Sequence, residues 1–362
     1  IFNHNKATMN QIVKNLETYH LHLSTEISHL ISEMSYELAL LGGPDSLYVQ
    51  EKIPAFKEIL NAKLNSYEKS IIEKYIRREI PYLVLEGLNI KKLDRSKIDI
   101  TQLTQLPSLE ILEKDIDILT LASSEQIILA LLEEDAFAFD IDNLGKIVRV
   151  VANLKGGGVT KIENENPDKS SHSGIELTAH TEAPYHTVTK VVDNHSPAPS
   201  SLILTARWNP LNEPTSLIPI SRVLSQLTLE EVLALTTKSF NFTRSETFNE
   251  GQGSGGENVA ILEVDKDGYK AMKYNSYRFS PNENASIKIK NAFYKFESIV
   301  RQTSIVDSIN LNPNTVLIIN NSLCLYCRDT IKDNRRTLVR LFGYRKNLDY
   351  IVLQKNPLIV KG

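Results

Sequence analysis

The chain has 362 residues, 41% of them hydrophobic and 23% charged, which is typical of a globular protein with a sizeable core. A net charge of −3, without any block of Lys and Arg interleaved with aromatic residues, argues against a nucleic-acid partner. The longest apolar runs, such as residues 127–132, are far shorter than the roughly 20 residues that cross a bilayer, so we expect no membrane insertion. Two cysteines make no disulfide framework, and we expect a reducing, cytoplasmic location.

The first third of the sequence has mainly helical periodicity, with apolar residues recurring every three or four positions. The predicted helices cover residues 10–41, 55–78 and 107–133, and residues 82–88 predict a buried strand. We therefore expect residues 1–80 to form a helical extension that packs on the remainder of the chain.

The rest of the sequence, residues 81–362, is dominated by short strand-like runs separated by turn residues. These runs cover residues 136–141, 174–182, 201–208, 258–264, 315–321, 323–328, 337–344 and 350–353. Their spacing favours a β-sandwich or barrel over alternating βαβ units. Two long polar stretches, 155–174 and 249–258, are of the kind that form lids or disordered loops.

One predicted strand carries a histidine and a carboxylate two residues apart. In "GIELTAHTEAPYH" these are His180 and Glu182, and on a strand both side chains leave the same face. An imidazole and a carboxylate side by side can hold a divalent metal, and they are two of the three ligands of a two-histidine, one-carboxylate iron(II) site. The bare pair also occurs by chance on surface strands.

The neighbourhood of this pair resembles the metal-binding segment of the clavaminate synthase-like and TauD-like iron(II)/2-oxoglutarate dioxygenases. The resemblance extends to "IPYLVLEGLNI", to "SLILTARWNPLNEPTSL" and to "NPNTVLIINNSLCLYCRDTIKDNRRTLVRLFGY". These segments are similar to the opening strand of the family's catalytic domain, to its co-substrate threonine segment and to its closing segment. Together they extend from about residue 80 to the end of the chain.

The resemblance implies a role for each matching residue. His180 and Glu182 match the first two iron ligands, and Thr215, with Ser216 as the alternative, matches the threonine that helps to hold 2-oxoglutarate. Arg340 matches the arginine that pairs with the distal carboxylate of 2-oxoglutarate, through a bidentate contact that suits a guanidinium group.

Three further residues are candidates because of strand alternation. Arg336 shares a strand face with Arg340, so it lines the same pocket or is a solvated charge. Glu176 shares a face with His180, which makes it a candidate for binding a substrate amine. His172, in the long polar loop, is interpreted as an exposed residue that could also fold over the site.

The distal histidine of the family is replaced in this sequence. Tyr326 stands fourteen residues before Arg340, where that ligand belongs, and no histidine follows His195. Tyr326 could bind as a phenolate, although its ordinary pKa near 10 makes that costly. The alternatives are a thiolate from Cys324 or Cys327, a metal held by two side chains or not at all, or an unexpected ligand such as His186 or His195.

The resemblance implies a double-stranded β-helix, or jelly-roll, core with a helical N-terminal part. It also implies an oxidoreductase that uses iron(II), 2-oxoglutarate and molecular oxygen to hydroxylate or desaturate a small amino-acid-like substrate. The departure at Tyr326 keeps two alternatives open. One is a catalytically silent relative that acts as a binding or scaffold module, and the other is an oxygenase with a changed metal or co-substrate.

Overall fold

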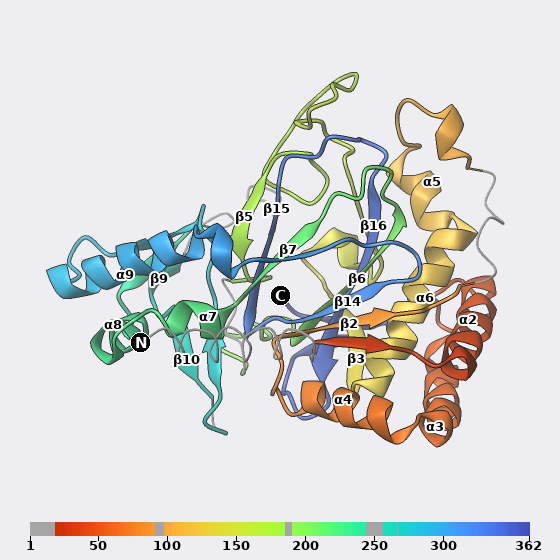
Figure 1. Cartoon of the computed structure of the whole chain (residues 1–362), viewed down its shortest axis with the longest axis horizontal. Coiled ribbons are helices and arrows are strands. Elements are labelled where there is room, and N and C mark those ends of the chain that lie inside the picture. Colours follow the sequence, from red (N-terminus) through yellow and green to blue (C-terminus); the bar gives the residue numbers. More distant parts are fainter. Residues whose placement is uncertain (1–18, 91–97, 185–189, 244–255, 266) are drawn as a thin grey trace, which may run out of the picture.

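The structure is a computed structural model that describes residues 19–90, 98–184, 190–243, 256–265 and 267–362. Two β-sheets form its centre, with helices on their outer faces (Figure 1). The larger sheet has the strand order β1-β2-β14-β6-β16-β3-β18-β17, and β4 also pairs with β16. The smaller sheet has the order β13-β7-β15-β5. Strands distant in sequence are therefore neighbours in both sheets, as in a sandwich.

The bounds of the strands are as follows. The larger sheet contains β1 (His20–His22), β2 (Tyr82–Glu86), β3 (Glu134–Phe139), β4 (Arg149–Ala152), β6 (Ser201–Trp208), β14 (Val316–Asn320), β16 (Thr337–Arg345), β17 (Val352–Lys355) and β18 (Leu358–Val360). The smaller sheet contains β5 (Leu177–His180), β7 (Thr215–Pro219), β13 (Asp307–Ile309) and β15 (Cys324–Arg328). Short strands outside these sheets are β8 (Phe240–Phe242), β9 (Gly256–Val259), β10 (Leu262–Val264), β11 (Lys270–Met272) and β12 (Phe279–Pro281).

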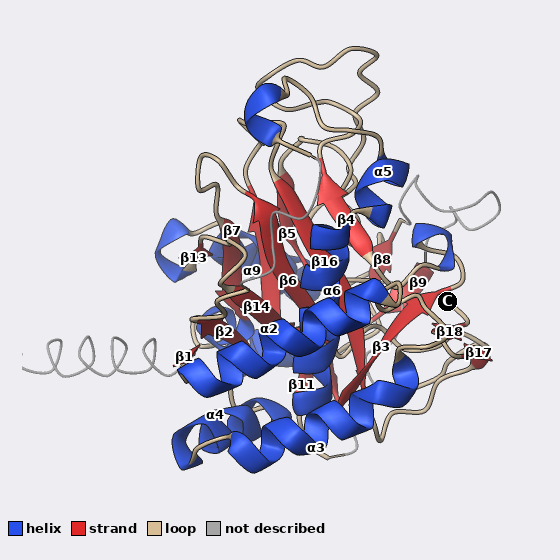
Figure 2. Cartoon of the chain, turned by 90° about the vertical axis from the view of Figure 1, so that its right-hand side faces the viewer, coloured by secondary structure: helices blue, strands red, loops and turns tan. Residues whose placement is uncertain are grey.

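The helices lie in two groups. One covers the outer face of the larger sheet (Figure 2), with α2 (Thr25–Leu40), α3 (Ile53–Lys63), α4 (Ser66–Ile76), α5 (Leu109–Lys114) and α6 (Ile116–Leu131). The other lies on the side of the smaller sheet, with α7 (Ile220–Leu224), α8 (Leu229–Leu235) and α9 (Ile287–Val300). In the part of the chain that the structure describes, no helix is both long and apolar enough to cross a membrane.

The predicted helix over residues 10–41 is only partly correct. Residues 10–18 lie outside the described residues, and β1 precedes the helix instead of continuing it. This strand pairs in parallel with β2, which buries Leu21 in the core. Ser24 then begins α2, because its hydroxyl accepts a hydrogen bond from the backbone N–H of Ile27 at 3.3 Å.

The other two predicted helices are each divided by a capping residue. Asn65 separates α3 from α4 through a capping box with Glu68, in which each side chain accepts from the other's backbone N–H. Asp115 separates α5 from α6 by accepting from the backbone N–H groups of Asp117 and Ile118. Apolar periodicity continues across both breaks, so periodicity alone wrongly predicts one helix where the capping residues divide it into two.

The core consists of three apolar clusters. The first lies between the larger sheet and α2 to α6, and it includes Ile31 of α2 and Val339 of β16. The second lies between the two sheets, and the third lies under α7 to α9. The space between the sheets also contains the candidate site.

Candidate active site

Strands β5 and β15 bring His180 and Tyr326 together. The two residues are register partners in the antiparallel pair, and their ring centroids are 4.1 Å apart. On its other side β15 pairs with β7, which begins at Thr215. Tyr326 therefore lies directly against the first candidate metal ligand.

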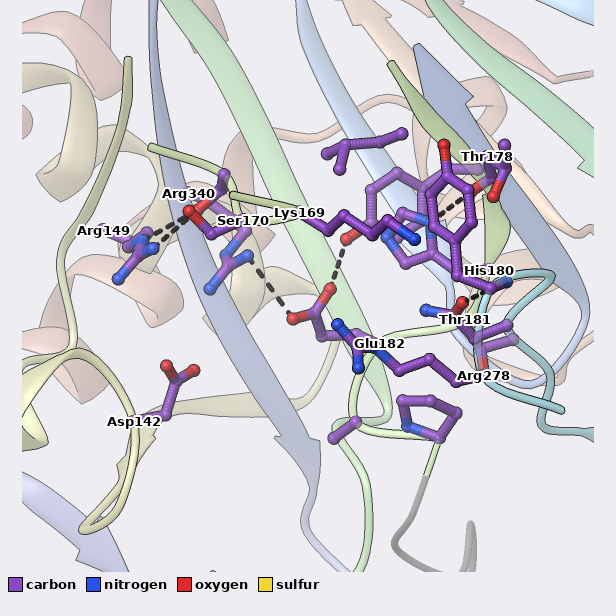
Figure 3. Close-up of a pocket in the computed structure, with 17 residues that line it drawn as sticks. Asp142, Arg149, Lys169, Ser170, Thr178, His180, Thr181, Glu182, Arg278 and Arg340 are labelled. Atoms are coloured by element: carbon purple, nitrogen blue, oxygen red, sulfur yellow. Dashed lines mark hydrogen bonds and ion pairs between the residues drawn. The ribbon is translucent and has the colours of Figure 1, made fainter. Parts of the chain in front are cut away.

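Glu182 lies two residues beyond His180 and is the centre of the polar contacts (Figure 3). One carboxylate oxygen accepts a hydrogen bond from the Tyr326 hydroxyl, and the other lies 3.5 Å from the Arg340 guanidinium. Asn321 fixes the backbone of Glu182, because it accepts from the Glu182 N–H at 2.8 Å and donates to the Glu182 carbonyl at 3.1 Å. Glu182 is thus held in one orientation from both ends.

The protonation states of His180 and Glu182 suit the binding of a metal cation. Burial raises the pKa of Glu182, but the charge of Arg340, His180 and the Tyr326 hydrogen bond together lower it below its ordinary value. Burial lowers the pKa of His180, so its ring is neutral at pH 7. Since Nδ1 of His180 lies 2.7 Å from the Thr178 carbonyl, which can only accept, Nδ1 carries the proton and the Nε2 lone pair remains for a metal.

Tyr326 is a neutral phenol in this environment. Burial raises its pKa well above 10, and the negative charge of Glu182 raises it further. The hydroxyl proton is donated to Glu182, so the group stabilises the carboxylate without offering a phenolate. Among the described residues no cluster of three His, Cys, Asp or Glu side chains could hold a metal.

A chamber lined by arginines lies behind Tyr326, with an empty volume of about 430 Å³. It is lined by Val151, Ser171, Leu177, Leu204, Thr215, Tyr326, Cys327, Arg328, Arg336, Leu338 and Arg340. Arg336 is 3% exposed and lies 3.3 Å from the Thr215 hydroxyl. Burial lowers the pKa of both Arg328 and Arg336 to about 10, so both remain charged at neutral pH. The chamber is therefore strongly positive.

A wider mouth cavity lies in front of Tyr326, with an empty volume of about 860 Å³. Its lining consists of Asp142, Arg149, Lys169, Ser170, Ser171, Leu177, Thr178, His180, Thr181, Glu182, Ala183, Pro184, Asn275, Tyr277, Arg278, Tyr326 and Arg340. Tyr326 and Arg340 line both this cavity and the chamber. His180 and Glu182 thus line the mouth cavity next to the two residues that border both spaces.

The remaining candidate residues lie in different places. Glu176 has an exposed side chain and does not line either cavity. His172 is not an exposed loop residue as expected, because its Nε2 lies 3.0 Å from the Val150 carbonyl and burial lowers its pKa to about 3. His195 lies 2.8 Å from the Gly362 carbonyl, outside the lining of both cavities, and His186 lies outside the described residues.

The two cysteines are free thiols. Cys324 is fully buried in the core between the sheets, and burial raises its pKa. Cys327 lines the chamber, and burial raises its pKa to about 11. Neither is thus a thiolate at neutral pH. Ser216, the alternative to Thr215, does not line either cavity.

Sequence reasoning missed two arginines of the site. Arg328 lies two residues after Tyr326, so strand alternation alone predicts that it shares the inward face. It donates to the carbonyls of Ser173 and Ile175 and so attaches the polar loop before β5 to the chamber. Arg149 lies at the start of β4, opposite Arg340 in the register, which no motif indicated.

No family model and no curated protein sequence matches the chain. It is similar to a solved asparagine oxygenase in complex with Fe(II), 2S,3S-3-hydroxyasparagine and succinate, at 17% identity and a TM-score of 0.65 over 90% of this chain and 93% of that one. It is also similar to the non-heme iron oxygenase OrfP in complex with Fe and alpha-ketoglutaric acid, at 18% identity and a TM-score of 0.65 over 89% and 93%. A further structure of asparagine oxygenase, AsnO, has 16% identity and a TM-score of 0.67 over 95% and 99%. This likeness confirms the predicted jelly-roll core.

Proposed function

We propose that this protein is an oxygenase that uses iron(II), 2-oxoglutarate and molecular oxygen to oxidise a carbon of a small amino-acid-like substrate. One observation carries the proposal: His180 and Glu182 contact Tyr326 and Arg340, and these two residues also line a chamber that contains two further arginines. The similar solved structures include complexes with iron, with alpha-ketoglutaric acid and with hydroxylated asparagine or arginine. The free thiols of Cys324 and Cys327 agree with a cytoplasmic location.

His180 and Glu182 would hold the iron. A neutral imidazole with an available Nε2 and an ionised carboxylate fit a divalent metal. Tyr326 is a positioning residue in this proposal, because its hydroxyl orients the Glu182 carboxylate. Iron(II) with 2-oxoglutarate would supply the oxidising chemistry that protein side chains lack.

The chamber would bind 2-oxoglutarate. Arg336 and Thr215 lie together at its wall and would take the distal carboxylate, through a charge-assisted contact and a hydroxyl hydrogen bond. Arg340, which lines both spaces, would then lie along the co-substrate near its keto-acid end. This assignment differs from that implied by the family resemblance, which gave Arg340 the distal carboxylate, since Arg336 is the arginine that contacts Thr215.

The mouth cavity would bind the substrate, in front of the metal pair. Its wall of charged and hydroxyl side chains suits a small zwitterion. Leu177 and Ala183 provide apolar surface beside the candidate metal ligands. The protein's part in the reaction is to present one carbon of this substrate to the site and to exclude competing groups.

Binding measurements without turnover test this function. We expect 2-oxoglutarate to bind to the wild type loaded anaerobically with iron(II), and Arg336→Gln to lose about tenfold or more of that affinity because a buried charged contact is removed. His180→Ala should lose affinity for iron(II) in an anaerobic titration. Arg301→Gln, at an exposed arginine on the end of α9, is the matched control and should change neither affinity.

A second candidate function is supported by Tyr326 itself. The donated hydroxyl proton on Glu182 and the absence of a third protein ligand among the described residues suit a relative that binds a dicarboxylate without oxidising anything. Such a protein would bind 2-oxoglutarate but would not consume oxygen with it. Failure of metal-loaded wild type to bind 2-oxoglutarate at all would contradict both functions.

A further inference from the structure

Among the described residues that line the mouth cavity, cations outnumber carboxylates. Among its described lining residues there are four cations, Arg149, Lys169, Arg278 and Arg340, and two carboxylates, Asp142 and Glu182. Burial lowers the pKa of Arg149 to about 10, which leaves it charged at neutral pH. Iron(II) and 2-oxoglutarate carry opposite charges of equal size, so the proposed cofactors would not change the charge balance among these described side chains.

Two of these cations lie opposite each other on neighbouring strands. Arg340 of β16 and Arg149 of β4 are register partners, and both side chains line the same cavity. Like charges directly opposite each other in a sheet are destabilising. Glu182 offsets part of this repulsion, because it lies 3.5 Å from Arg340 and its charge also acts on Arg149. A ligand anion between the two arginines would offset more of it, since each guanidinium has several donors in a planar fork.

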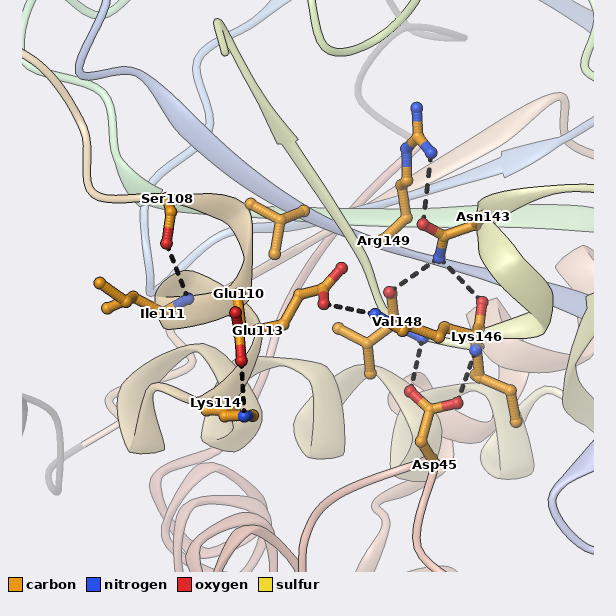
Figure 4. Close-up of polar contacts among 12 residues, drawn as sticks. Asp45, Ser108, Glu110, Ile111, Glu113, Lys114, Asn143, Lys146, Val148 and Arg149 are labelled. Atoms are coloured by element: carbon orange, nitrogen blue, oxygen red, sulfur yellow. Dashed lines mark hydrogen bonds and ion pairs between the residues drawn. The ribbon is translucent and has the colours of Figure 1, made fainter. Parts of the chain in front are cut away.

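Arg149 is held in place before any ligand arrives (Figure 4). Its guanidinium donates to the Ser171 hydroxyl at 2.7 and 3.0 Å and to the Asn143 side-chain oxygen at 3.2 Å. Asn143 in turn donates to the carbonyls of Lys146 and Val148. A side chain fixed in this way loses little freedom on binding.

The loop of residues 142–148, which carries Asn143, is fixed by contacts from Asp45 and Glu113. Asp45 accepts from the backbone N–H groups of Ile147 and Val148 at 2.7 and 3.1 Å, and Lys146 donates to Glu113 at 2.6 Å. Asp142 lies in this loop and lines the cavity with Arg149 (Figure 3). Its carboxylate faces the cavity, where its charge acts on Arg149, and it could also meet the amine of a ligand.

We infer that the substrate is an amino acid with an acidic side chain. One carboxylate would lie at the Arg149 and Arg340 pair, the second would lie toward Lys169, and the amine would meet Asp142. The inference rests on the proposed function and narrows its substrate class. A cationic side chain would meet like charges in this cavity, which disfavours it without any steric clash.

Calorimetry on the wild type, loaded anaerobically with iron(II) and 2-oxoglutarate in a buffer without phosphate, tests the inference. We expect L-aspartate or L-glutamate to bind about tenfold or more tightly than the matching amides, L-asparagine and L-glutamine, and L-arginine to bind most weakly. Amides or arginine that bind as well as the acids would overturn it. The binding of 2-oxoglutarate is measured first. If the wild type does not bind 2-oxoglutarate, the proposed function fails and this inference fails with it; if it does bind, the amino-acid panel tests the inference alone.

Variants locate the effect in the cavity. Arg149→Gln should lose about tenfold of the affinity for the acidic amino acid while keeping that for 2-oxoglutarate, and Asp142→Asn should weaken binding of every amino acid in the panel. Arg301→Gln, far from the cavity, should match the wild type. Lys169→Gln, at a side chain that lies over the Tyr277 ring, is the second test if Arg149→Gln does not fold. Unchanged selectivity for acids over amides in these variants would overturn the inference.

Discussion

Glu182 is the residue on which the chemistry of the candidate site depends, and its two neighbours set its state. Tyr326 donates to one carboxylate oxygen and Arg340 lies 3.5 Å from the other. Both contacts favour the ionised form, but both also occupy the oxygens that a metal would use. The two contacts therefore have opposite effects on the affinity for iron(II). They favour it by keeping Glu182 ionised, and they weaken it because the metal must displace Tyr326 and Arg340 from the carboxylate oxygens.

We predict that Tyr326→His raises the affinity for iron(II) by about tenfold or more and increases oxygen consumption driven by 2-oxoglutarate, because an imidazole completes the three-ligand face. Anaerobic iron titration and an oxygen electrode measure the two effects. Tyr326→Phe is the control, since it keeps a ring beside His180 but offers no ligand. The prediction is contradicted if the wild type already consumes oxygen rapidly and Tyr326→His is slower. The Tyr326 phenol would then serve the site better than a histidine.

Among the elements, strands were more predictable than helix boundaries. Strand β6 begins and ends at the predicted residues, because its apolar run is uninterrupted and turn residues flank it. Tyr326 on β15 and Arg340 on β16 line both cavities, and motif and strand alternation agree on these two candidates. Strand β1 was missed, because its stability comes from pairing with β2, which local sequence does not reveal.

The arginines show the same limit within the candidate site. Arg336 and Arg340 were expected to share a face from their spacing alone, and both line the chamber. Arg149 could not be predicted, because its closeness to Arg340 depends on the register between β4 and β16. The contact between Arg336 and Thr215 could not be predicted either, because the two residues are 121 positions apart in the sequence.

Glu134, the first residue of β3, links three elements. Its carboxylate accepts from Ser201 of β6 at 2.7 Å, and the Ser201 hydroxyl lies 2.6 Å from that of Tyr75 in α4. The side chain is 3% exposed, and burial raises its pKa to about 7. The native state therefore keeps a proton that the unfolded chain releases near pH 4.5, so this residue lowers the stability of the fold as the pH rises from about 4.5 to 7.

We predict that Glu134→Gln, which cannot titrate, gains stability relative to the wild type over that interval. The difference should grow by on the order of 3 kcal/mol between pH 4.5 and 7 and stay constant above pH 7. Urea unfolding at a series of pH values measures it. Glu110→Gln, at an exposed glutamate, is the control and should show a flat difference; a flat difference for Glu134→Gln as well would contradict the proposed protonation.

For the whole molecule, the helical N-terminal part and the larger sheet share one apolar core. Helix α6 is buried on nearly every side, between α2 and the sheet. Its buried Asp117 forms an ion pair with the buried Arg207 of β6 at 2.9 Å, which fixes the helix to the sheet. Helices α2 to α4 thus contribute to the same apolar core as α6 and the larger sheet.

We predict that Ile31→Ala, in the buried face of α2, destabilises the whole chain by about 2–5 kcal/mol. Far-UV circular dichroism reports the helices, and fluorescence of Trp208, the sole tryptophan, reports the larger sheet. Both transitions should move together, since one core is weakened. Ile59→Ala, at a half-exposed position on α3, is the control and should change little. Two separated transitions would instead indicate that the helical part unfolds independently.

The arginine-lined chamber has a consequence for the lifetime of the protein if it binds a dicarboxylate. Arg328, Arg336 and Arg340 are buried near one another and outnumber the carboxylate of Glu182 beside Arg340, so a further anion among them should stabilise the native state. A dicarboxylate that binds only the native state stabilises it by about 2.7 kcal/mol at one hundred times its dissociation constant. Proteases cleave the transiently opened chain in proportion to its population. If 2-oxoglutarate is the dicarboxylate, as we propose, the amount of this protein in a cell would therefore follow the supply of that metabolite.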